Sequence, residues 1–375
     1  MPMTADRASV EGAPVDSVSA TAYTIPTDTP EADGTLSWDS TTLILVEARA
    51  GGCCGIGWTY GASVVADLVT RKLADIVVGR PALDIGSCFT AMVAAIRNIG
   101  RDGIAGQAIS AVDVALWDLK ARMLRVPLYR LLGAVRDEVA VYGSGGFTSY
   151  DDEQLRAQLT RWTRLGIPRV KIKIGESWGT RTERDLARMG MARETVGDAT
   201  ELYVDANGGY GRKQAVRVMR AAAEFDVRWF EEPVSSDDLD GLRAVRDAVD
   251  PDVAAGEYGY DLYYFRRMCE ARAVDCLQID ATRCGGLTEW LRAAAVAAAY
   301  GLEVSGHCAP YLHMHVAAAT PNLRHLEWFH DHVRIEQMIF DGARDPVGGA
   351  LRPDTDAPGH GLELRIPVVE QFRTN

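Results

Sequence analysis

The stretch VKIKIG, residues 170–175, decides the fold that we predict for this chain of 375 residues. Its branched apolar residues alternate with Lys171 and Lys173, a pattern that predicts a β-strand with both lysines on one face. Taken alone, such a strand is usually half exposed, and its lysines are solvated. Apolar runs that end in acids recur downstream, however, and their spacing changes the interpretation of the two lysines.

Strand and helix patterns alternate from residue 139 to residue 327. Strands are predicted at 139–142, 169–174, 202–205, 229–231, 253–256, 276–279, 303–305 and 325–327. Helices are predicted between them, at 151–165, 183–195, 212–225, 237–247, 262–270, 287–299 and 311–319. Eight strands that alternate with helices predict a parallel (β/α)8 barrel of the α/β class.

A different pattern precedes the barrel. Strands are predicted at 17–25, 41–48 and 56–60, and helices at 62–78, 85–98 and 105–123. Residues 27–38 are predicted to form an exposed, adaptable loop, because Pro30, Gly34 and several polar residues occur there. We therefore divide the chain into an α+β module at 1–130, the barrel at 131–350 and a segment at 351–375. A strand at 362–366 is expected to return to the first module.

The composition excludes several classes of protein. Apolar residues make up 47% of the chain and the formal net charge is −12, which argues against binding to nucleic acid or anionic membranes and is typical of a soluble enzyme. The seven cysteines form no C-x-x-C pair, which favours free thiols in a reducing compartment. No secretory signal and no membrane span is recognisable. We expect a cytoplasmic protein.

Three acids occupy matching positions in successive strand–helix units. Asp205, Glu231 and Glu257 follow one another at intervals of 26 residues, and the carboxyl ends of barrel strands face one common site. Buried neighbouring carboxylates repel one another, so the three predict a hard divalent cation, and all-oxygen ligation suits Mg²⁺. The alternative, in which each acid caps a helix or pairs with an arginine, explains one acid better than three.

Two candidate bases flank this predicted cation. Lys173 is on the second strand, where Lys171 and the cation are expected to lower its pKa toward that of a base. His307 follows the seventh strand, and Asp280 can fix its tautomer. Without the acids, a structural histidine would be the better interpretation of His307. Two bases beside one cation indicate removal of a proton next to a carboxylate, with the cation stabilising an enediolate.

Eight segments can be compared with known families. They are AVDVALWDLK (111–120), VKIKIG (170–175), YVDANGG (203–209), WFEEP (229–233), AGE (255–257), IDATRCGG (279–286), SGH (305–307) and HLE (325–327). Together they resemble the mandelate racemase subgroup of the enolase superfamily, over residues 41–364. The resemblance implies that residues 1–130 form a capping domain, to which residues 351–375 return.

The resemblance also implies roles for individual residues. These are Mg²⁺ ligation by Asp205, Glu231 and Glu257, acid/base catalysis by Lys173 and by the pair His307 and Asp280, and binding of the substrate carboxylate by Lys171 and Glu327. Asn207 and Glu232 would support the metal site. The substrate would be a small carboxylate, and a homo-oligomer between a dimer and an octamer is expected.

Three further residues are candidate substrate contacts. The cap segments at 27–38 and 55–60 would close over the substrate, which makes Trp58 and Tyr60 candidates. Packing in the cap core is an equally good explanation of these two aromatics. Ser144, at the end of the first barrel strand, is a third candidate, with turn capping as its alternative.

Several reactions fit these residues. Dehydration of a sugar acid to a 2-keto-3-deoxy acid is common in the resembled subgroup and is our first prediction. Racemisation or epimerisation of a 2-hydroxy acid, and cycloisomerisation of a sugar-acid derivative, are the alternatives. A binding protein without catalysis would be expected to lack Lys173, His307 or a metal ligand, and all are present. A Schiff base on Lys173 is a further alternative, which the neighbouring metal ligands disfavour.

Two H-x-H pairs, His313 with His315 and His330 with His332, contain ligand types that zinc accepts. His313 and His315 fall in a predicted helix, where residues two apart do not share a face. We therefore expect structural roles for these histidines.

Overall fold

The structure is a computed structural model that describes residues 12–374. Residues 1–11, the start of the predicted capping domain and of the segment without a recognisable signal, lie outside the described residues, as does Asn375. The described chain begins with an antiparallel sheet of three strands in sequence order. The strands are β1 (Ser17–Ala32), β2 (Ser37–Ala50) and β3 (Cys53–Tyr60).

Helices cover one face of this cap sheet. They are α2 (Val64–Leu68), η1 (Val69–Leu73), α3 (Ala74–Val77), α4 (Ile85–Ala95), α5 (Ile104–Leu124) and α6 (Leu128–Leu131). The helix α5 lies directly on β3, because Gly55 and Gly57 have no side chains. A Cβ atom on Gly57 would lie 2.2 Å from the backbone oxygen of Ala111. The G-x-G pattern therefore permits close contact between strand and helix.

Eight parallel strands form the barrel, and pairing of the last strand with the first closes it. The strands are β4 (Val139–Gly145), β5 (Arg169–Lys173), β6 (Glu201–Asp205), β7 (Val227–Glu231), β8 (Asp252–Ala255), β9 (Cys276–Ile279), β10 (Glu303–Gly306) and β11 (Leu323–Phe329). The short strand β13 (Ala350–Leu351) pairs antiparallel with β4 outside this ring. The (β/α)8 barrel with an N-terminal α+β cap is confirmed.

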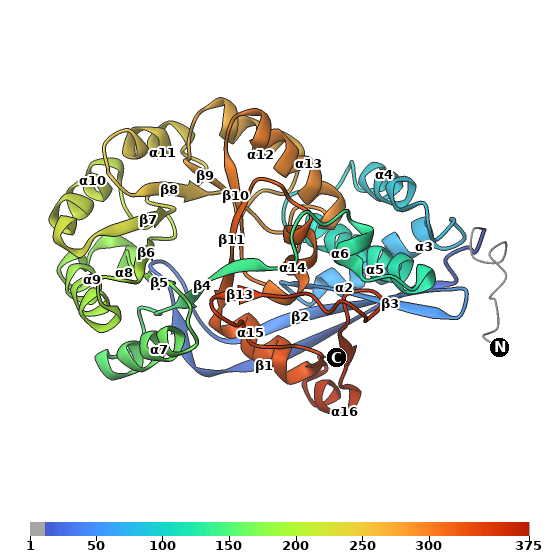
Figure 1. Cartoon of the computed structure of the whole chain (residues 1–375). Helices are drawn as coiled ribbons and strands as arrows, with labels where there is room; N and C mark the ends of the chain where they lie inside the picture. Colours follow the sequence, from blue (N-terminus) through green and yellow to red (C-terminus); the bar gives the residue numbers. More distant parts are fainter. Residues whose placement is uncertain (1–11, 375) are drawn as a thin grey trace.

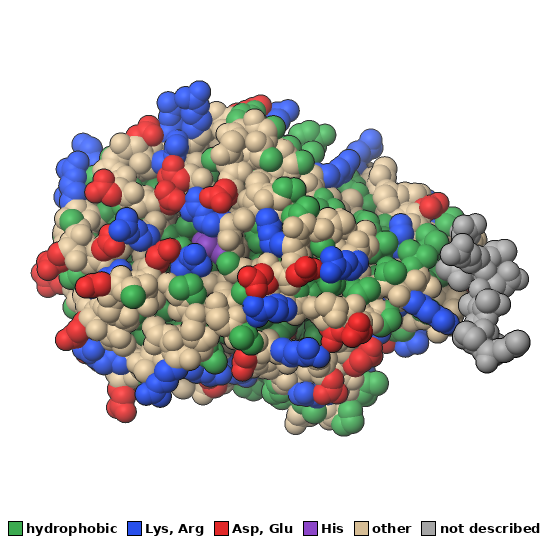
Figure 2. Space-filling model, in the orientation of Figure 1, with side chains coloured by type: hydrophobic (Ala, Val, Ile, Leu, Met, Phe, Trp, Pro, Cys, Tyr) green, Lys and Arg blue, Asp and Glu red, His purple; other side chains and the backbone are tan. Residues whose placement is uncertain are grey.

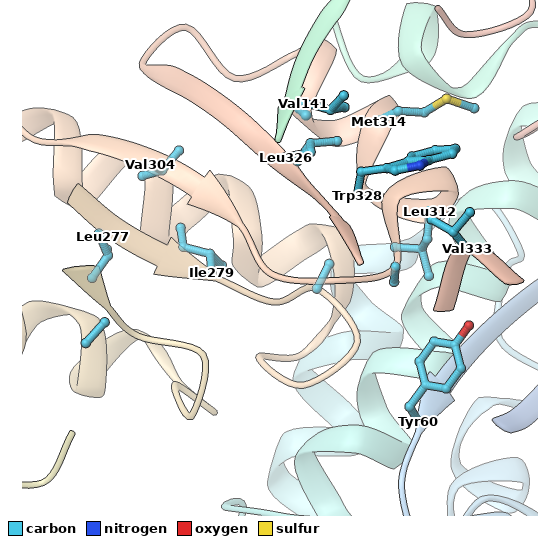
Figure 3. Packing of buried hydrophobic residues seen from close by; sticks show 14 of the residues in the cluster. Tyr60, Val141, Leu277, Ile279, Val304, Leu312, Met314, Leu326, Trp328 and Val333 are labelled. Carbon is cyan, nitrogen blue, oxygen red and sulfur yellow. The ribbon is translucent and has the colours of Figure 1, made fainter. Parts of the chain in front are cut away.

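The helices between the strands form the outer layer, as Figure 1 shows. They are α7 (Asp152–Arg164), α8 (Glu176–Gly179), α9 (Thr182–Val196), α10 (Arg212–Ala221), η2 (Ala223–Phe225), α11 (Leu239–Arg246), α12 (Leu262–Glu270), α13 (Gly286–Ala299), α14 (Pro310–Ala318) and α15 (His330–Ile339). Figure 3 shows how they pack: Leu326 and Trp328 of β11 lie beside Leu312 and Met314 of α14. The helix α15 was absent from the predicted elements.

The register of the strands places Lys173 of the VKIKIG segment beside the acids at the ends of β6 and β7. Lys173 is paired with Asp205 across β5 and β6, and Asp205 with Glu231 across β6 and β7. Val170 and Ile172 are fully buried in the core shared with the helices. The alternation in the sequence therefore places both lysines inside the barrel, as predicted.

The predicted loop at 27–38 is wrong. Strand β1 continues to Ala32 and β2 begins at Ser37, so only a short turn separates them, and Pro26 sits just before a shift in their pairing. In Figure 1 these two strands run from the cap helices toward β5 and α7. The turn is fixed there, because Trp178 donates a backbone hydrogen bond to Gly34 and Thr148 donates one to Ala32.

The C-terminal segment returns to the cap by contacts other than the predicted strand. The strand β14 (Glu363–Leu364) pairs with β12 (Phe340–Asp341), not with the cap sheet. After α16 (Ile366–Val369) and η3 (Glu370–Phe372), Arg373 forms a bridge with Tyr23 of β1. The backbone N–H of His360 donates a hydrogen bond of 2.8 Å to Asp118 of α5.

The surface carries charges of both signs. Figure 2 shows acidic and basic side chains interspersed over the face that it displays. None of the helices within residues 12–374 combines the length and apolar character needed to cross a bilayer.

Candidate active site

Three buried carboxylates meet at the carboxyl end of the barrel. Asp205 ends β6, Glu231 ends β7, and Glu257 lies two residues beyond β8. One oxygen atom from each side chain lies within 4.8 Å of the others. Each of the three residues is at most 4% exposed. The predicted convergence of the three acids is therefore present in the structure.

The chemistry of this group fits a divalent cation. Burial raises the pKa of Glu231 to about 7, with Asp205 adding to the rise and Lys171 opposing it. Among the described buried atoms, Glu257 Oε2, Asn207 Oδ1 and Glu232 Oε1 have no hydrogen-bond partner. Carboxylate oxygens gathered this closely, with acceptors to spare, form a donor set that a hard divalent cation accepts.

The backbone is strained where it carries these oxygens. Asn207, Glu232 and Cys308, each just beyond a barrel strand, adopt left-handed conformations with φ of 45°, 38° and 52°. Such conformations are uncommon for residues other than glycine and are concentrated at functional sites. The strain therefore supports the assignment of this end of the barrel as the functional end.

Lys171 and Lys173 lie on the β5 side of the carboxylates. Lys171 is fully buried and its Nζ is 2.5 Å from Glu231 Oε1 and 2.7 Å from Glu327 Oε1. Lys173 is in direct contact with Asp205. Burial is the largest influence on the pKa of Lys173 and acts to lower it, as does Lys171, but Asp205, Glu327 and Glu231 together raise it. The predicted lowering of this pKa was ascribed to Lys171 and the cation, and for the cation-bound site it stays a prediction.

His307 lies on the opposite side, after β10. Its Nδ1 is 2.8 Å from Asp280 Oδ2, and its Nε2 is 3.3 Å from Glu257 Oε2 in a geometry that makes no hydrogen bond. Burial acts to lower the pKa of His307, but Glu257 and Asp280 raise it above its usual value. The hydrogen bond to Asp280 directs the other ring nitrogen, Nε2, toward the carboxylates.

The remaining histidines of the H-x-H pairs have structural surroundings. His313 Nδ1 is 2.7 Å from the backbone oxygen of Cys308, and its Nε2 accepts a hydrogen bond of 2.8 Å from the backbone N–H of Ala281. His332 stacks on Tyr60 with ring centroids 3.5 Å apart. Among the described residues, His330 lies in a group of potential metal ligands with Asp28 and Glu31, whereas His313, His315 and His332 lie in none.

Glu327 and Ser144 are linked beneath the site. Glu327 accepts hydrogen bonds from the Ser144 hydroxyl (2.6 Å) and from the backbone N–H of Cys308 (2.9 Å), and Lys171 is its ion-pair partner. Ser144 is fully buried and is not among the residues that line the cavity. The substrate contact predicted for Ser144 stays a prediction; its hydroxyl is bonded to Glu327, which, like Lys171, is also absent from that lining.

A cavity of about 410 Å³ lies between the barrel end and the cap. The barrel contributes Lys173, Asn207, Glu257, Tyr258, Asp280, Thr282, Arg283, His307, Cys308 and Phe329, and α15 contributes Asp331 and His332. The cap contributes Asp33, Leu36, Trp38, Ser40, Thr41, Thr42, Tyr60 and Gly61. A larger cavity of about 630 Å³ lies between α7 and α15 but contains none of the three acids. We assign the smaller cavity as the active site, because it contains the proton-transfer groups.

The two predicted cap aromatics differ in position. Tyr60 lines the cavity and donates a hydrogen bond of 3.0 Å to Glu336. Trp58 does not line it: its indole is fully buried, lies against Phe340 and donates a hydrogen bond of 2.9 Å to Glu336. The two side chains share one face of β3, but only the one at the end of the strand reaches the cavity. The prediction that Trp58 contacts substrate is therefore corrected.

Sequence reasoning expected the segment 27–38 to cover the substrate but named no residue in it, and it missed Ser40, Thr41 and Thr42. Leu36, Trp38 and Thr41 line the cavity because the β1–β2 turn docks on the barrel, an arrangement that depends on distant contacts. The polar run from Ser40 to Thr42 is too short a signal to reveal it. Cys308 follows His307 directly and lies with its Sγ 3.2 Å from His307 Nε2, so its proximity could have been inferred.

Comparisons with known proteins agree with this geometry. Residues 154–368 match the family described as enolase C-terminal domain-like, and residues 19–133 match the mandelate racemase/muconate lactonizing enzyme N-terminal domain. The chain is 33% identical to L-talarate/galactarate dehydratase of Salmonella typhimurium over 80% of this chain and 77% of that protein.

Two solved structures extend the likeness. A mandelate racemase/muconate lactonizing enzyme-like protein from Rubrobacter xylanophilus is 48% identical, with a TM-score of 0.93 over 96% of this chain and 100% of that one. A racemase from Streptomyces coelicolor with bound magnesium is 30% identical, with a TM-score of 0.90 over 96% of this chain and 100% of that one. The protein is therefore an enzyme that belongs to the mandelate racemase/muconate lactonizing enzyme family of the enolase superfamily.

Proposed function

We propose that the enzyme removes the proton next to a substrate carboxylate in an Mg²⁺-dependent reaction that proceeds through an enediolate. The net reaction is dehydration of a sugar acid to a 2-keto-3-deoxy acid. The observation that carries the proposal is the pair of proton-transfer groups, Lys173 at the end of β5 and His307 after β10, on two sides of one carboxylate cluster. Dehydration needs one group to take the α-proton and another to protonate the departing β-hydroxyl.

The carboxylate cluster, Asp205, Glu231 and Glu257, would hold Mg²⁺, which supplies positive charge to stabilise the enediolate. Lys171 would neutralise the substrate carboxylate, and Glu327, already bonded to Lys171, would hydrogen-bond to it by donating a proton that the Glu327 carboxyl group takes up when substrate binds. The proton transfers of the reaction are carried out by side chains of the protein.

In the proposed order, Lys173 removes the α-proton. His307, oriented by its 2.8 Å contact with Asp280, then protonates the β-hydroxyl. The C–O bond breaks, water leaves, and the resulting enol becomes the 2-keto acid when a proton returns to the β-carbon. Because the two groups lie on different barrel strands, the substrate is held between them.

One alternative uses the same residues. In a racemase or epimerase, one base removes the α-proton and the other returns it to the opposite face. The placement of Lys173 and His307 on two sides of the cluster fits racemisation or epimerisation as well as it fits dehydration. Cycloisomerisation of a sugar-acid derivative is a third candidate. A Schiff base on Lys173 is disfavoured by its position among the carboxylates that would hold Mg²⁺, with Asp205 in direct contact with its Nζ.

We also propose the division of the chain into a cap at 1–130, a barrel at 131–350 and a returning segment at 351–375. A separate hydrophobic core, whose buried members run from Val15 to Met123, supports the first unit. We further propose that the enzyme is cytoplasmic and homo-oligomeric, between a dimer and an octamer, and that it binds a small carboxylate, a sugar acid or a 2-hydroxy acid, and neither nucleic acid nor membranes.

The test uses the full chain with Mg²⁺ and a panel of sugar acids. A 2-keto-3-deoxy product supports dehydration, and α-proton exchange in D₂O without keto product supports racemisation or epimerisation. The variants Lys173→Met and His307→Asn are each expected to lose exchange with at least one epimer of the substrate, whereas Lys213→Met, on the exposed face of α10, serves as the matched control. Unchanged exchange in the first two variants would refute the assigned roles.

A further inference from the structure

We propose that the substrate is a monocarboxylate whose far end is uncharged, such as an aldonic acid, and not a dicarboxylate such as an aldaric acid. This inference rests on the proposed function and specifies its substrate class. It depends on the charges that line the cavity opposite the proton-transfer groups.

The cations of the cavity lie on the barrel side, and carboxylates of the protein already contact them. Lys173 contacts Asp205. Arg283 lies 3.3 Å from Glu257 Oε1 and 3.5 Å from Asp280 Oδ2, and it stacks over Tyr258. The positive charge of Arg283 is therefore balanced by two buried carboxylates, and Lys173 is committed to the α-carbon end of the substrate.

The cap side offers no lysine or arginine to a second carboxylate. The sequence from Asp16 to Ala48, which contains the whole β1–β2 turn, has no basic residue, but it has six acids: Asp16, Asp28, Glu31, Asp33, Asp39 and Glu47. Of these, Asp33 lines the cavity. The strand β3 likewise has no charged residue. A substrate that carried a carboxylate toward the cap would meet a negative field.

The groups that do line the cap side suit a neutral polyol. Hydroxyls are supplied by Ser40, Thr41, Thr42 and Tyr60, which bond within the protein to Asp39, Asp331, Thr24 and Glu336 and keep lone pairs that can accept hydrogen bonds from a sugar. Apolar surfaces are supplied by Leu36 and Trp38. The C–H groups of a sugar chain can pack on such apolar surfaces. Asp331, the other acid on this side, has Arg334 as its partner at 2.6 Å. Hydroxyls donate and accept hydrogen bonds and therefore match the hydroxyls of a sugar.

His332 does not supply the missing cation. It lines the cavity, but burial lowers its pKa well below the usual value, with His307 adding to the effect. Its ring is stacked on Tyr60, and its Nδ1 accepts a hydrogen bond of 3.3 Å from the backbone N–H of Ala309. A second carboxylate in this region would lose its hydration and find no cation among the cap-side lining residues, all of which the structure describes. Such a loss of solvation is a strong basis for discrimination.

The experiment compares matched pairs of acids that differ only in the terminal carbon, such as gluconate with glucarate and galactonate with galactarate. Product formation and α-proton exchange are measured with Mg²⁺ for both members of each pair. For the reactive pair, kcat/KM is expected to be at least about tenfold higher for the monocarboxylate. Equal or faster reaction of the dicarboxylate overturns this inference but leaves the proposed function intact.

A binding measurement separates the two levels of the proposal. The hydroxamates that correspond to each pair are titrated into the Mg²⁺-containing protein by calorimetry, and the aldonohydroxamate is expected to bind at least about tenfold more tightly. Tighter binding of the aldarohydroxamate would overturn the inference. If no acid reacts or exchanges and no hydroxamate binds, the proposed function fails and this inference fails with it.

A gain-of-charge variant tests the same idea from the protein side. Leu36 lines the cavity at the β1–β2 turn and is 67% exposed, so Leu36→Lys should fold. It is expected to raise the ratio of kcat/KM for dicarboxylate over monocarboxylate by about tenfold. The control Ser37→Lys adds the same charge one residue away, outside the cavity lining, and should leave the ratio unchanged. If this ratio of kcat/KM is the same in Leu36→Lys and Ser37→Lys, the far end of the substrate does not face the cap side of the cavity, and the inference is overturned.

Discussion

Replacing Glu336 with glutamine should make the protein more resistant to unfolding at alkaline pH. Glu336 is fully buried on α15, and its Oε1 accepts hydrogen bonds from Trp58 Nε1 at 2.9 Å and from the Tyr60 hydroxyl at 3.0 Å. Both partners belong to the cap, so this carboxyl group joins the cap to the barrel. Glutamine can keep both bonds, because its side-chain oxygen accepts in the same way.

The size of the effect follows from the pKa of Glu336. Burial raises this pKa from 4.5 to about 8, although the hydrogen bonds from Trp58 and Tyr60 oppose the rise. The folded protein therefore binds a proton that the unfolded chain releases, and stability falls as the pH rises from 4.5 to about 8. Each unit of pKa corresponds to about 1.36 kcal/mol, so at pH values above this range the free energy of unfolding is lower by about 5 kcal/mol in total.

The assay is urea unfolding of the wild type and of Glu336→Gln at several pH values. Between about pH 5 and pH 9, the free energy of unfolding of the wild type should fall by about 4 kcal/mol more than that of the variant. The exposed Glu224 provides the control, since Glu224→Gln should follow the wild type at every pH. Parallel curves for wild type and Glu336→Gln would refute the idea that Glu336 is protonated in the folded protein.

Three further outcomes are expected. Asp118→Ala should lower the free energy of unfolding by about 3–5 kcal/mol in urea, because it leaves the backbone N–H groups of Ile56 and His360 and an ion-paired arginine without their buried acceptor; a loss below about 1 kcal/mol would contradict this role. Trp58→Phe should lower the free energy of unfolding by about 1–3 kcal/mol, because the hydrogen bond from the indole to Glu336 is lost. The variant should keep the KM of the wild type, because the indole lies outside the cavity. Exhaustive dialysis against EDTA should abolish α-proton exchange, Mg²⁺ should restore it, and saturating Mg²⁺ at about 100 times its Kd should add about 2.7 kcal/mol to the free energy of unfolding.

The barrel was predictable because its signals are local and repeated. Each strand pattern is short, but eight repeats in one order specify a closed parallel sheet, and closure then brings the strand-end residues together. Asp205 and Glu231 were assigned to one site from their spacing, and the register of β5, β6 and β7 places them side by side. The contacts that act on the pKa of Lys173 could not be predicted in this way, because they depend on how close its ammonium group lies to Asp205, Glu327 and Glu231.

The cap was less predictable because its conformation depends on distant contacts. Pro26 and Pro30 made residues 27–38 look like a loop, yet the chain there is extended, since pairing with β2 and docking on the barrel determine its shape. Trp58 and Tyr60 are two residues apart in one strand, and no local pattern distinguishes the one that reaches the cavity. The prediction of where β14 pairs was also wrong, because the sequence of a two-residue strand contains almost no information about its partner.

The contacts between the C-terminal segment and the cap can form only late in synthesis on the ribosome. Arg373 bridges to Tyr23, and His360 binds Asp118, so residues separated by more than 240 positions must meet before the cap is fastened. A nascent chain emerges from its N-terminus and can complete the eight strands while these last contacts are still missing. Translation that stops before His360 would therefore yield a barrel with the chemical groups in place under a cap that lacks its final ties.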